Sequence, residues 1–546
     1  MQRALLSVWL GVVVFNVGTG HEQSLPAAKQ KQALLEQERL RREHATQNEQ
    51  AQHGMCRLTI ELVSKETQKT LAGNVRLVDQ SAQQPLDLKG LISRPESWYS
   101  IDGTATVDVP RTRIQVSAFH GVESLMATQE IDVRERGAAT IRISVGRFYD
   151  LGKQHLVSGN THLHLNRLSR SESDRYLRTV PAADGIDLLY VSHLIRAIED
   201  ETYITNEYDW KSLADLSNDD VTLRFGEEHR HNLGPHAEGF GHVMLLDIPR
   251  LIQPVSIGPG LTQAGSDGLP LNRGIREAHR VDGTVVWCHN SFGMEDVPNW
   301  MTGMLHAQNI HDGGPHGQYE DTFYRYMNLG LRVPFSTGTD WFIYDLSRVF
   351  IPLEGQVTSE AWLAALQRGQ SFITNGPLLE LKIGQQVIGD TLELVKGDVV
   401  EIAAKGVGRR DFRRIELVHN GNVVDDVDSQ LGRSGVYEAA LEFRLELAEP
   451  GWVALRVPWE NNRNLFGEKI FAHTSAIYLD VDGQQRFDRK VAHELIVEME
   501  RNLGIIQRMA QFDSAEEEQR VLKVHREGIL ALQERMLGAS REENDQ

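Results

Sequence analysis

Two histidines in the middle of the chain have the spacing of a metal-binding pair. His162 and His164 are separated by one residue, within a segment (159–164) that has the character of a short strand. Side chains two residues apart on a strand point to the same face, so both imidazoles can reach one ion. The pair alone is weak evidence for a metal site, because a single histidine is more often a surface or core residue whose nitrogens are already hydrogen-bonded.

Further side chains of metal-ligating type follow in order, most of them beside apolar, strand-like runs. Together with the His-x-His pair, the predicted metal ligands are His162, His164, Glu228, His242, His289 and Asp340. Imidazole nitrogen and carboxylate oxygen bind zinc, manganese and iron well. Six ligands are enough for two divalent ions, which in hydrolytic sites lie about 3.5–4 Å apart and share an activated water.

Two more histidines are candidates for acid–base chemistry or substrate contact. His193 follows the apolar run 188–191, and His231 lies in the histidine-rich segment 227–232 beside Glu228. Histidine suits proton transfer because its unperturbed pKa is close to neutral. The alternative for the segment around His231 is a solvated loop.

Composition limits the classes of function. The chain has 546 residues, which predicts three or more domains, and a net charge of −19, which argues against a nucleic-acid partner. Cys56 and Cys288 are its two cysteines, so a cysteine-rich zinc site is excluded and any metal must be held by histidines and carboxylates. Cys288, inside an apolar run, is expected to be a buried structural thiol.

The first residues resemble a signal peptide. Residues 1–3 carry a basic side chain, an apolar run follows at 4–15, and small residues lie near 18–20. We therefore expect a signal peptide at 1–20, a periplasmic or secreted protein, and no stable insertion in a membrane. Residues 21–53 are expected to form a polar helix or a flexible spacer.

The hydrophobic pattern changes twice along the rest of the chain. Alternation of apolar and polar residues predicts β-sandwiches at 54–148 and 378–482, and strands alternating with helical stretches predict a parallel sheet or barrel at 149–377. Residues 483–546 carry an apolar stripe at helical spacing. This segment is predicted to form a helical hairpin that packs on a domain or on another subunit, giving a homo-oligomer in the second case.

Residues 150–380 resemble the PHP (polymerase and histidinol phosphatase) superfamily, specifically its CehA/McbA-type metallohydrolases. The matching motifs, in order, are the segments 159–164, 187–193, 226–228, 241–244, 287–290, 336–340 and 369–377. The resemblance implies a distorted seven-stranded β/α barrel, flanked here by the two sandwiches, with Glu228 as the carboxylate that bridges metals. It also implies hydrolysis of phosphoesters or of ester- and carbamate-like bonds.

Two departures from the family pattern concern a third metal. Phe342 occupies a position that is often histidine in the family, and residues 165–168 contain neither the acidic residue nor the histidine that usually follows the first motif. Two ions are therefore expected, which leaves His193 for proton donation or substrate contact.

The resulting hypothesis is an exported hydrolase. It would bind zinc, manganese or iron and cleave an ester, carbamate, amide or phosphoester bond of a small molecule with a metal-bound hydroxide. The alternative is a non-catalytic protein that uses a degenerate PHP metal pocket to bind a ligand or a surface partner.

Overall fold

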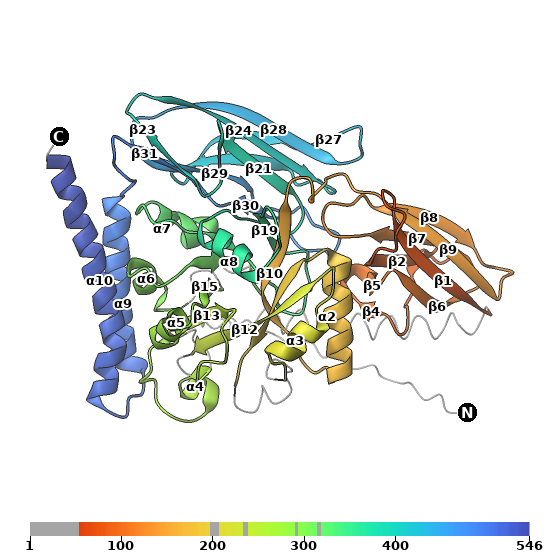
Figure 1. The fold of residues 1–546 in the computed structure, drawn as a ribbon, viewed down its shortest axis with the longest axis horizontal. Coiled ribbons are helices and arrows are strands. Elements are labelled where there is room, and N and C mark those ends of the chain that lie inside the picture. Colours follow the sequence, from red (N-terminus) through yellow and green to blue (C-terminus); the bar gives the residue numbers. More distant parts are fainter. Residues whose placement is uncertain (1–53, 197–206, 233–238, 290–292, 314–317, 545–546) are drawn as a thin grey trace, which may run out of the picture.

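The computed structural model describes residues 54–196, 207–232, 239–289, 293–313 and 318–544. The predicted signal peptide and spacer lie outside these residues. The described chain is a strand-rich mixed α/β structure with several sheets and a pair of C-terminal helices. Figure 1 shows the β-rich N-terminal unit at the right of a mixed middle unit, a second β-rich unit along the top, and the two long helices at the left.

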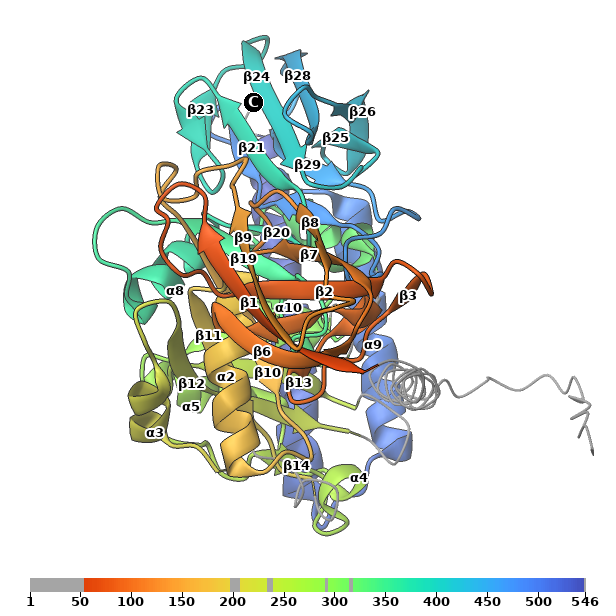
Figure 2. The same cartoon turned by 90° about the vertical axis from the view of Figure 1, so that its right-hand side faces the viewer.

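The N-terminal unit is sandwich-like. One sheet consists of β1 (Met55–Ser64), β6 (Thr104–Pro110) and β9 (Ala138–Val145). The other contains β2 (Gly73–Asp79), β3 (Gln84–Pro85), β4 (Ile92–Ser93), β5 (Tyr99–Ile101), β7 (Arg113–Phe119) and β8 (Ala127–Asp132). Leu58, Ile60 and Leu62 are fully buried, which confirms the predicted alternation along β1. Figure 2 views this unit face-on.

The middle unit is built on a mixed sheet. In hydrogen-bonded order its strands are β10 (Leu156–His164), β11 (Leu188–His193), β12 (Thr222–His231), β13 (Gly241–Leu246), β15 (Thr284–Cys288), β16 (Ala307–Asn309) and β17 (Phe335–Ser336). The helices between them include α2 (Arg170–Asp184), α3 (Trp210–Leu216), α5 (Leu271–Arg280) and α6 (Asp296–Met301). Helix α2 begins at a capping box on Ser169 and ends at Gly185, which adopts a left-handed conformation.

Strand β13 departs from the expected parallel arrangement, because it runs antiparallel to both β12 and β15. Residues 232–240 connect it to β12, and nine residues are fewer than the dozen or so that a parallel crossover needs. The start of β13 consequently lies beside the ends of its neighbours. Its second residue, His242, is paired with Arg230 on β12 and with Cys288 on β15.

The C-terminal β-rich unit shares a continuous sheet with the middle unit. Strand β20 (Phe372–Thr374) pairs with β19 (Arg348–Pro352), which pairs with β10, and on its other side with β30 (Ala472–Thr474). The remaining strands on this side are β23 (Thr391–Leu394), β25 (Arg414–His419), β26 (Asn422–Asp428), β29 (Gly451–Val457) and β31 (Ile477–Val481). Against them packs a five-stranded sheet of β21 (Leu378–Ile383), β22 (Gln386–Val387), β24 (Val399–Gly408), β27 (Gln430–Leu431) and β28 (Tyr437–Glu446).

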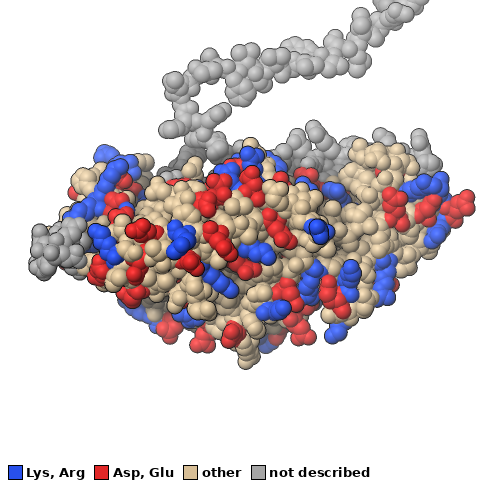
Figure 3. Space-filling model, turned by 90° about the horizontal axis from the view of Figure 1, so that it is seen from above, with Lys and Arg blue, Asp and Glu red and all other residues tan. Residues whose placement is uncertain are grey.

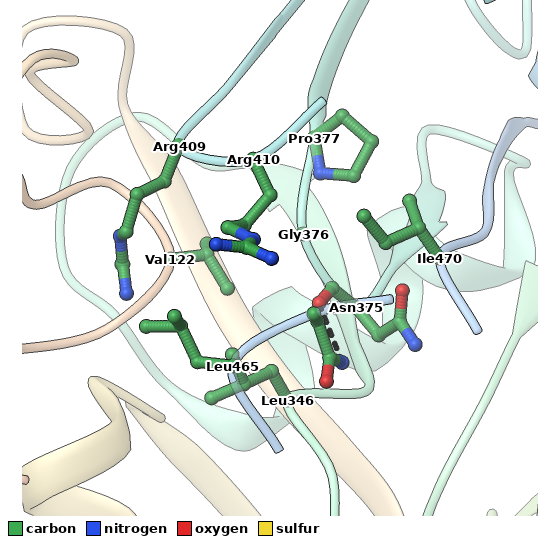
Figure 4. Close-up of a pocket in the computed structure, with 10 residues that line it drawn as sticks. Val122, Leu346, Asn375, Gly376, Pro377, Arg409, Arg410, Leu465 and Ile470 are labelled. Carbon is green, nitrogen blue, oxygen red and sulfur yellow. Dashed lines mark hydrogen bonds between the residues drawn. The ribbon is translucent and has the colours of Figure 1, made fainter. Parts of the chain in front are cut away.

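A small pocket marks the junction of the three units (Figure 4). It is lined by Val122 of the N-terminal unit, Leu346 of the middle unit and Arg409 of the C-terminal unit, among others. The Arg409 guanidinium donates hydrogen bonds to the backbone oxygens of Gly121 and Ser124, at 2.5 and 2.6 Å. This arginine therefore fastens the two sandwich-like units to each other.

The two C-terminal helices pack on the middle unit. They are α9 (Arg489–Met509) and α10 (Ala515–Asn544), and the His525 side chain of α10 contacts the Met294 oxygen at 2.8 Å, just before α6. Gly528 permits a close approach, since a Cβ there would lie 2.6 Å from Pro298. The helical pair is confirmed, whereas the homo-oligomer stays a prediction. Among the described helices, none combines the length and the apolar character needed to cross a bilayer.

Charged side chains of both signs are interspersed over the face seen in Figure 3. On this face, the described residues form no continuous basic band of the kind that a nucleic-acid backbone requires.

Candidate metal centre

The structure brings all six predicted ligands together at one end of the mixed sheet. Their ligand atoms fall into two groups, and within each group the atoms lie no more than 4.8 Å apart. The first group is His162, His164, Glu228 and Asp340, and the second is Glu228, His242 and His289. All six residues are buried. The antiparallel direction of β13 explains why His242 lies at the start of its strand while His164 and His289 lie at the ends of theirs: the start of β13 lies at the same end of the sheet.

Glu228 belongs to both groups, and each of its oxygens faces one of them. Its Oε2 lies 2.8 Å from His164 Nε2 and 3.7 Å from His162 Nε2. Its Oε1 lies 3.2 Å from His242 Nδ1 and 3.5 Å from His289 Nε2. This is the geometry of a carboxylate that can bridge two ions.

Hydrogen bonds fix which nitrogens of the His-x-His pair point inward. His162 Nδ1 lies 2.7 Å from Asp312 Oδ2, and His164 Nδ1 lies 2.8 Å from the Ser192 carbonyl oxygen. Both partners can only accept, so in a neutral ring Nδ1 carries the proton and Nε2 carries a lone pair. The two Nε2 atoms are 2.9 Å apart. With both rings neutral, lone pairs at this distance repel each other, and either a proton on one ring or a metal ion between the two nitrogens relieves the repulsion.

His242 shows the same pattern in the second group. Its Nε2 lies 2.7 Å from Asn232 Oδ1, an acceptor, which leaves Nδ1 facing Glu228. Metal-ligating histidines commonly donate their other N–H to such a partner, which fixes the ring and its tautomer.

The cluster carries an excess of buried negative charge. Burial lowers the pKa of His289, but the Glu228 carboxylate facing its Nε2 at 3.5 Å and the charges of Asp340 and Asp312 outweigh this effect and raise the pKa to about 9. The pKa of His162 is likewise held well above its usual value by Asp312 and Asp340, against the effect of burial. The site therefore favours additional positive charge.

Two buried oxygens in the described cluster, Glu228 Oε1 and Asp312 Oδ1, have no hydrogen-bond partner. An unpaired buried carboxylate oxygen is costly unless a cation compensates it. Together with the converging lone pairs, these oxygens show that the residues present fit divalent ions.

The backbone is strained where it supplies two of the ligands. His289 and Asp340 have positive φ angles of 62° and 56°, in the left-handed region that most side chains avoid. Gly338 is required nearby, because a Cβ at this position would lie 2.4 Å from the Cβ of His162. Strain of this kind persists where the surrounding structure holds a functional geometry.

Asp312 is a member of the cluster that the sequence analysis did not identify. Its Oδ2 accepts hydrogen bonds from His162 Nδ1 and from Asn309 Nδ2, at 2.7 and 2.9 Å. It also belongs to a third group of possible ligands, with His162, Cys288 and His289. Because His162 already turns Nε2 toward Glu228, the contact with Nδ1 makes Asp312 a residue that orients His162.

Cys288 is buried and free, as is Cys56. Burial, reinforced by the charges of Glu228 and Asp312, raises the pKa of the Cys288 thiol well above its usual value. The neutral thiol packs beneath the cluster, in keeping with a structural residue.

We expect Asp312→Asn to lower metal affinity roughly 10- to 100-fold while the protein stays folded, because the amide holds the His162 ring less firmly than the carboxylate. Competition with a chromogenic chelator measures the affinity. An unchanged affinity would show that Asp312 does not position His162.

The two predicted acid–base residues lie outside the three groups. His193 Nδ1 and Nε2 each lie 2.9 Å from a carbonyl oxygen, those of Gly226 and Tyr208, and burial lowers the pKa of His193 to about 4. His231 Nε2 contacts Asp267 at 3.0 Å, and its Nδ1 accepts a hydrogen bond from the Phe240 N–H at 3.2 Å. Both rings are enclosed by local partners, which favours structural roles, and their catalytic assignment stays a prediction.

His193→Ala should lower the free energy of unfolding by about 3 kcal/mol, because it removes a buried ring stacked on Phe225 and the one hydrogen bond that the neutral ring donates to a carbonyl oxygen. Turnover per folded molecule should change less than a few-fold. Melting temperature, metal content and turnover are measured on one preparation. A loss of roughly 10²- to 10⁴-fold in rate with metals retained would restore His193 to the mechanism.

Phe342 fills the position at which the family pattern often has a histidine. Its ring lies 5.6 Å from that of Tyr176, and its backbone N–H donates to the His164 oxygen at 2.8 Å. Phe342 has an apolar partner there and offers no ligand atom, and the number of ions stays a prediction.

No protein-family model matches this chain, and no curated protein matches it. The chemistry of the site therefore carries the functional argument.

Proposed function

We propose that this protein is an exported, metal-dependent hydrolase of the PHP type that holds two divalent ions, zinc, manganese or iron. His162, His164 and Asp340 would hold one ion, His242 and His289 the other, and Glu228 would bridge them. The observation that carries the proposal is the pair of Glu228 oxygens, each turned toward a different histidine group. Export rests on the sequence of residues 1–20 alone.

The proposed fold of the middle unit is the distorted barrel of that superfamily. After β17 the chain returns to β10, where the Thr161 N–H donates to the Thr337 oxygen at 3.4 Å and the Thr339 N–H to the His162 oxygen at 3.0 Å. Strand β18 (Asp340–Trp341) then pairs in parallel with β10. These bonds bring the segment that follows β17 back to the first strand, which supports the proposal of a closed barrel.

Bound ions would polarise the scissile group and lower the pKa of a water. Residues of the chain would hold the ions and accept the proton. Burial raises the pKa of Glu228, but the Arg230 charge and hydrogen bonds from the histidines hold it well below its usual value, so the bridging carboxylate stays ionised. Asp340 is the carboxylate that solvent can best reach, with 12% of its side chain exposed against 1% for Glu228. We assign Asp340 as the group that accepts a proton from the attacking water.

A panel of chromogenic substrates tests the proposal. The metal-reconstituted protein is assayed with a 4-nitrophenyl carboxyl ester, a 4-nitrophenyl phosphate and an aryl carbamate, each with and without a chelator. Metal-dependent turnover of at least one bond type is expected. Full metal occupancy without turnover of any of them would favour the alternative, a protein that uses the metal pocket only for binding.

A further inference from the structure

An arginine lies directly above the bridging carboxylate. Arg230 is two residues beyond Glu228 on β12, on the same face and one step nearer the end of the strand. Its NH1 lies 3.4 Å from Glu228 Oε2, and its register partner on β13 is His242. Only 8% of the residue is exposed, and its Nε is buried without a hydrogen-bond partner in the described structure.

A second arginine approaches the same side of the centre. Arg196 places its guanidinium carbon 5.5 Å from the centre of the Trp341 ring, and that ring lies 4.8 Å from the ring of His164. His164 links the two arginines, because its Nε2 lies 2.8 Å from the Glu228 oxygen that Arg230 contacts, and its ring packs on the Trp341 ring that Arg196 faces.

The charge of Arg230 is poorly compensated by the protein alone. Its contact with Glu228 is a single, long interaction, whereas a guanidinium can form two parallel hydrogen bonds to an oxyanion. Two divalent ions would bring four positive charges to three carboxylates, Glu228, Asp312 and Asp340. With Glu228 bound to metal, Arg230 would be a buried cation whose nearest carboxylate is already neutralised, and such a charge needs a counter-ion.

We propose that Arg230 and Arg196 form a subsite for an oxyanion, a carboxylate or a phosphoryl group, on the substrate. The proposal rests on the proposed hydrolase function and gives its substrate class, a small molecule that carries a negative charge beside the scissile ester or amide bond. The Trp341 face next to the subsite would contact the apolar part of the same molecule.

Binding of simple anions to the metal-loaded protein tests the subsite without an activity assay. Acetate has one carboxylate for the ions, whereas succinate has a second one for the arginines. Calorimetry should show succinate binding roughly 10- to 100-fold more tightly than acetate. Phosphonoacetate in place of succinate tells whether the subsite prefers a phosphoryl group or a carboxylate.

Arg230→Gln and Arg196→Gln should each reduce the ratio of succinate to acetate affinity toward one. Arg230→Lys should retain part of it, because the charge remains but the paired donors are lost. The matched control is Arg526→Gln, which removes an exposed guanidinium on α10 and should leave the ratio unchanged. Metal content is measured on every variant. If Arg230→Gln loses metal, Arg196→Gln still tests the subsite, because no contact between Arg196 and a proposed ligand carboxylate is found in the described structure.

Equal binding of acetate and succinate by metal-loaded wild-type protein would overturn the subsite and leave the hydrolase proposal standing. A preference for succinate that is unchanged in both Arg230→Gln and Arg196→Gln would also overturn the subsite and leave the hydrolase proposal standing. A wild-type protein that takes up no metal would overturn both proposals.

Discussion

Glu228→Gln should strip the protein of both metal ions and reduce metal-dependent hydrolysis to background. The amide keeps the size of the side chain but loses the negative charge, and one of its two terminal atoms becomes a donor that faces histidine lone pairs. The loss should exceed the roughly 10- to 100-fold effect expected for partners outside the ligand set, because Glu228 faces both groups.

The neighbouring residue provides a matched control for this substitution. Glu227 is equally buried but points to the other face of β12, where it contacts His229 Nδ1 at 2.8 Å and accepts a hydrogen bond from the Ile252 N–H. Glu227→Gln is the same chemical change one residue away and should keep full metal content per folded molecule. Equal metal loss in both variants would point to general damage of β12 rather than to a bridging role.

Removal of metal should lower the melting temperature of the wild-type protein by on the order of 10 °C. Metal at 1,000 times its dissociation constant adds about 4 kcal/mol to the stability of the folded state, and each kcal/mol shifts the transition by roughly 2–4 °C in a domain of this size. The physical cause is the buried charge of the carboxylates and the 2.9 Å contact between His162 Nε2 and His164 Nε2.

Scanning calorimetry with and without a chelator measures this shift. The Glu228→Gln variant is the control, because a protein that no longer binds metal should respond little to the chelator. A wild-type transition that is the same in both conditions would contradict a metal-stabilised centre.

The metal ligands could be predicted because their signals are local. His162 and His164 show the period of a strand, and His289 directly follows the apolar run that forms β15. Their positions beside successive strand-like runs were enough to predict that these side chains lie at one end of a sheet.

Asp312 was missed because the strand that precedes it, β16, lacks an apolar pattern. Strand β16 contains Gln308 and Asn309, polar residues that are fully buried only because they have specific partners, Trp300 Nε1 and the Asp312 carboxylate. Such burial depends on tertiary contacts and leaves no hydrophobic pattern in the sequence.

The surroundings of His193 were equally invisible in the sequence. His193 lies at the end of an apolar strand, as several ligands do. Its Nε2, however, contacts the backbone oxygen of Tyr208, which lies 15 residues further along the chain. The bond between β20 and β30 joins positions about 100 residues apart, so the continuity of the middle and C-terminal sheets could not be read from local periodicity.

Elemental analysis of the purified, metal-reconstituted protein tests the central claim most directly. The geometry around Glu228 predicts two divalent ions per chain, with close to none in Glu228→Gln and two in Glu227→Gln. Less than half an ion per wild-type chain after reconstitution would contradict the dinuclear centre.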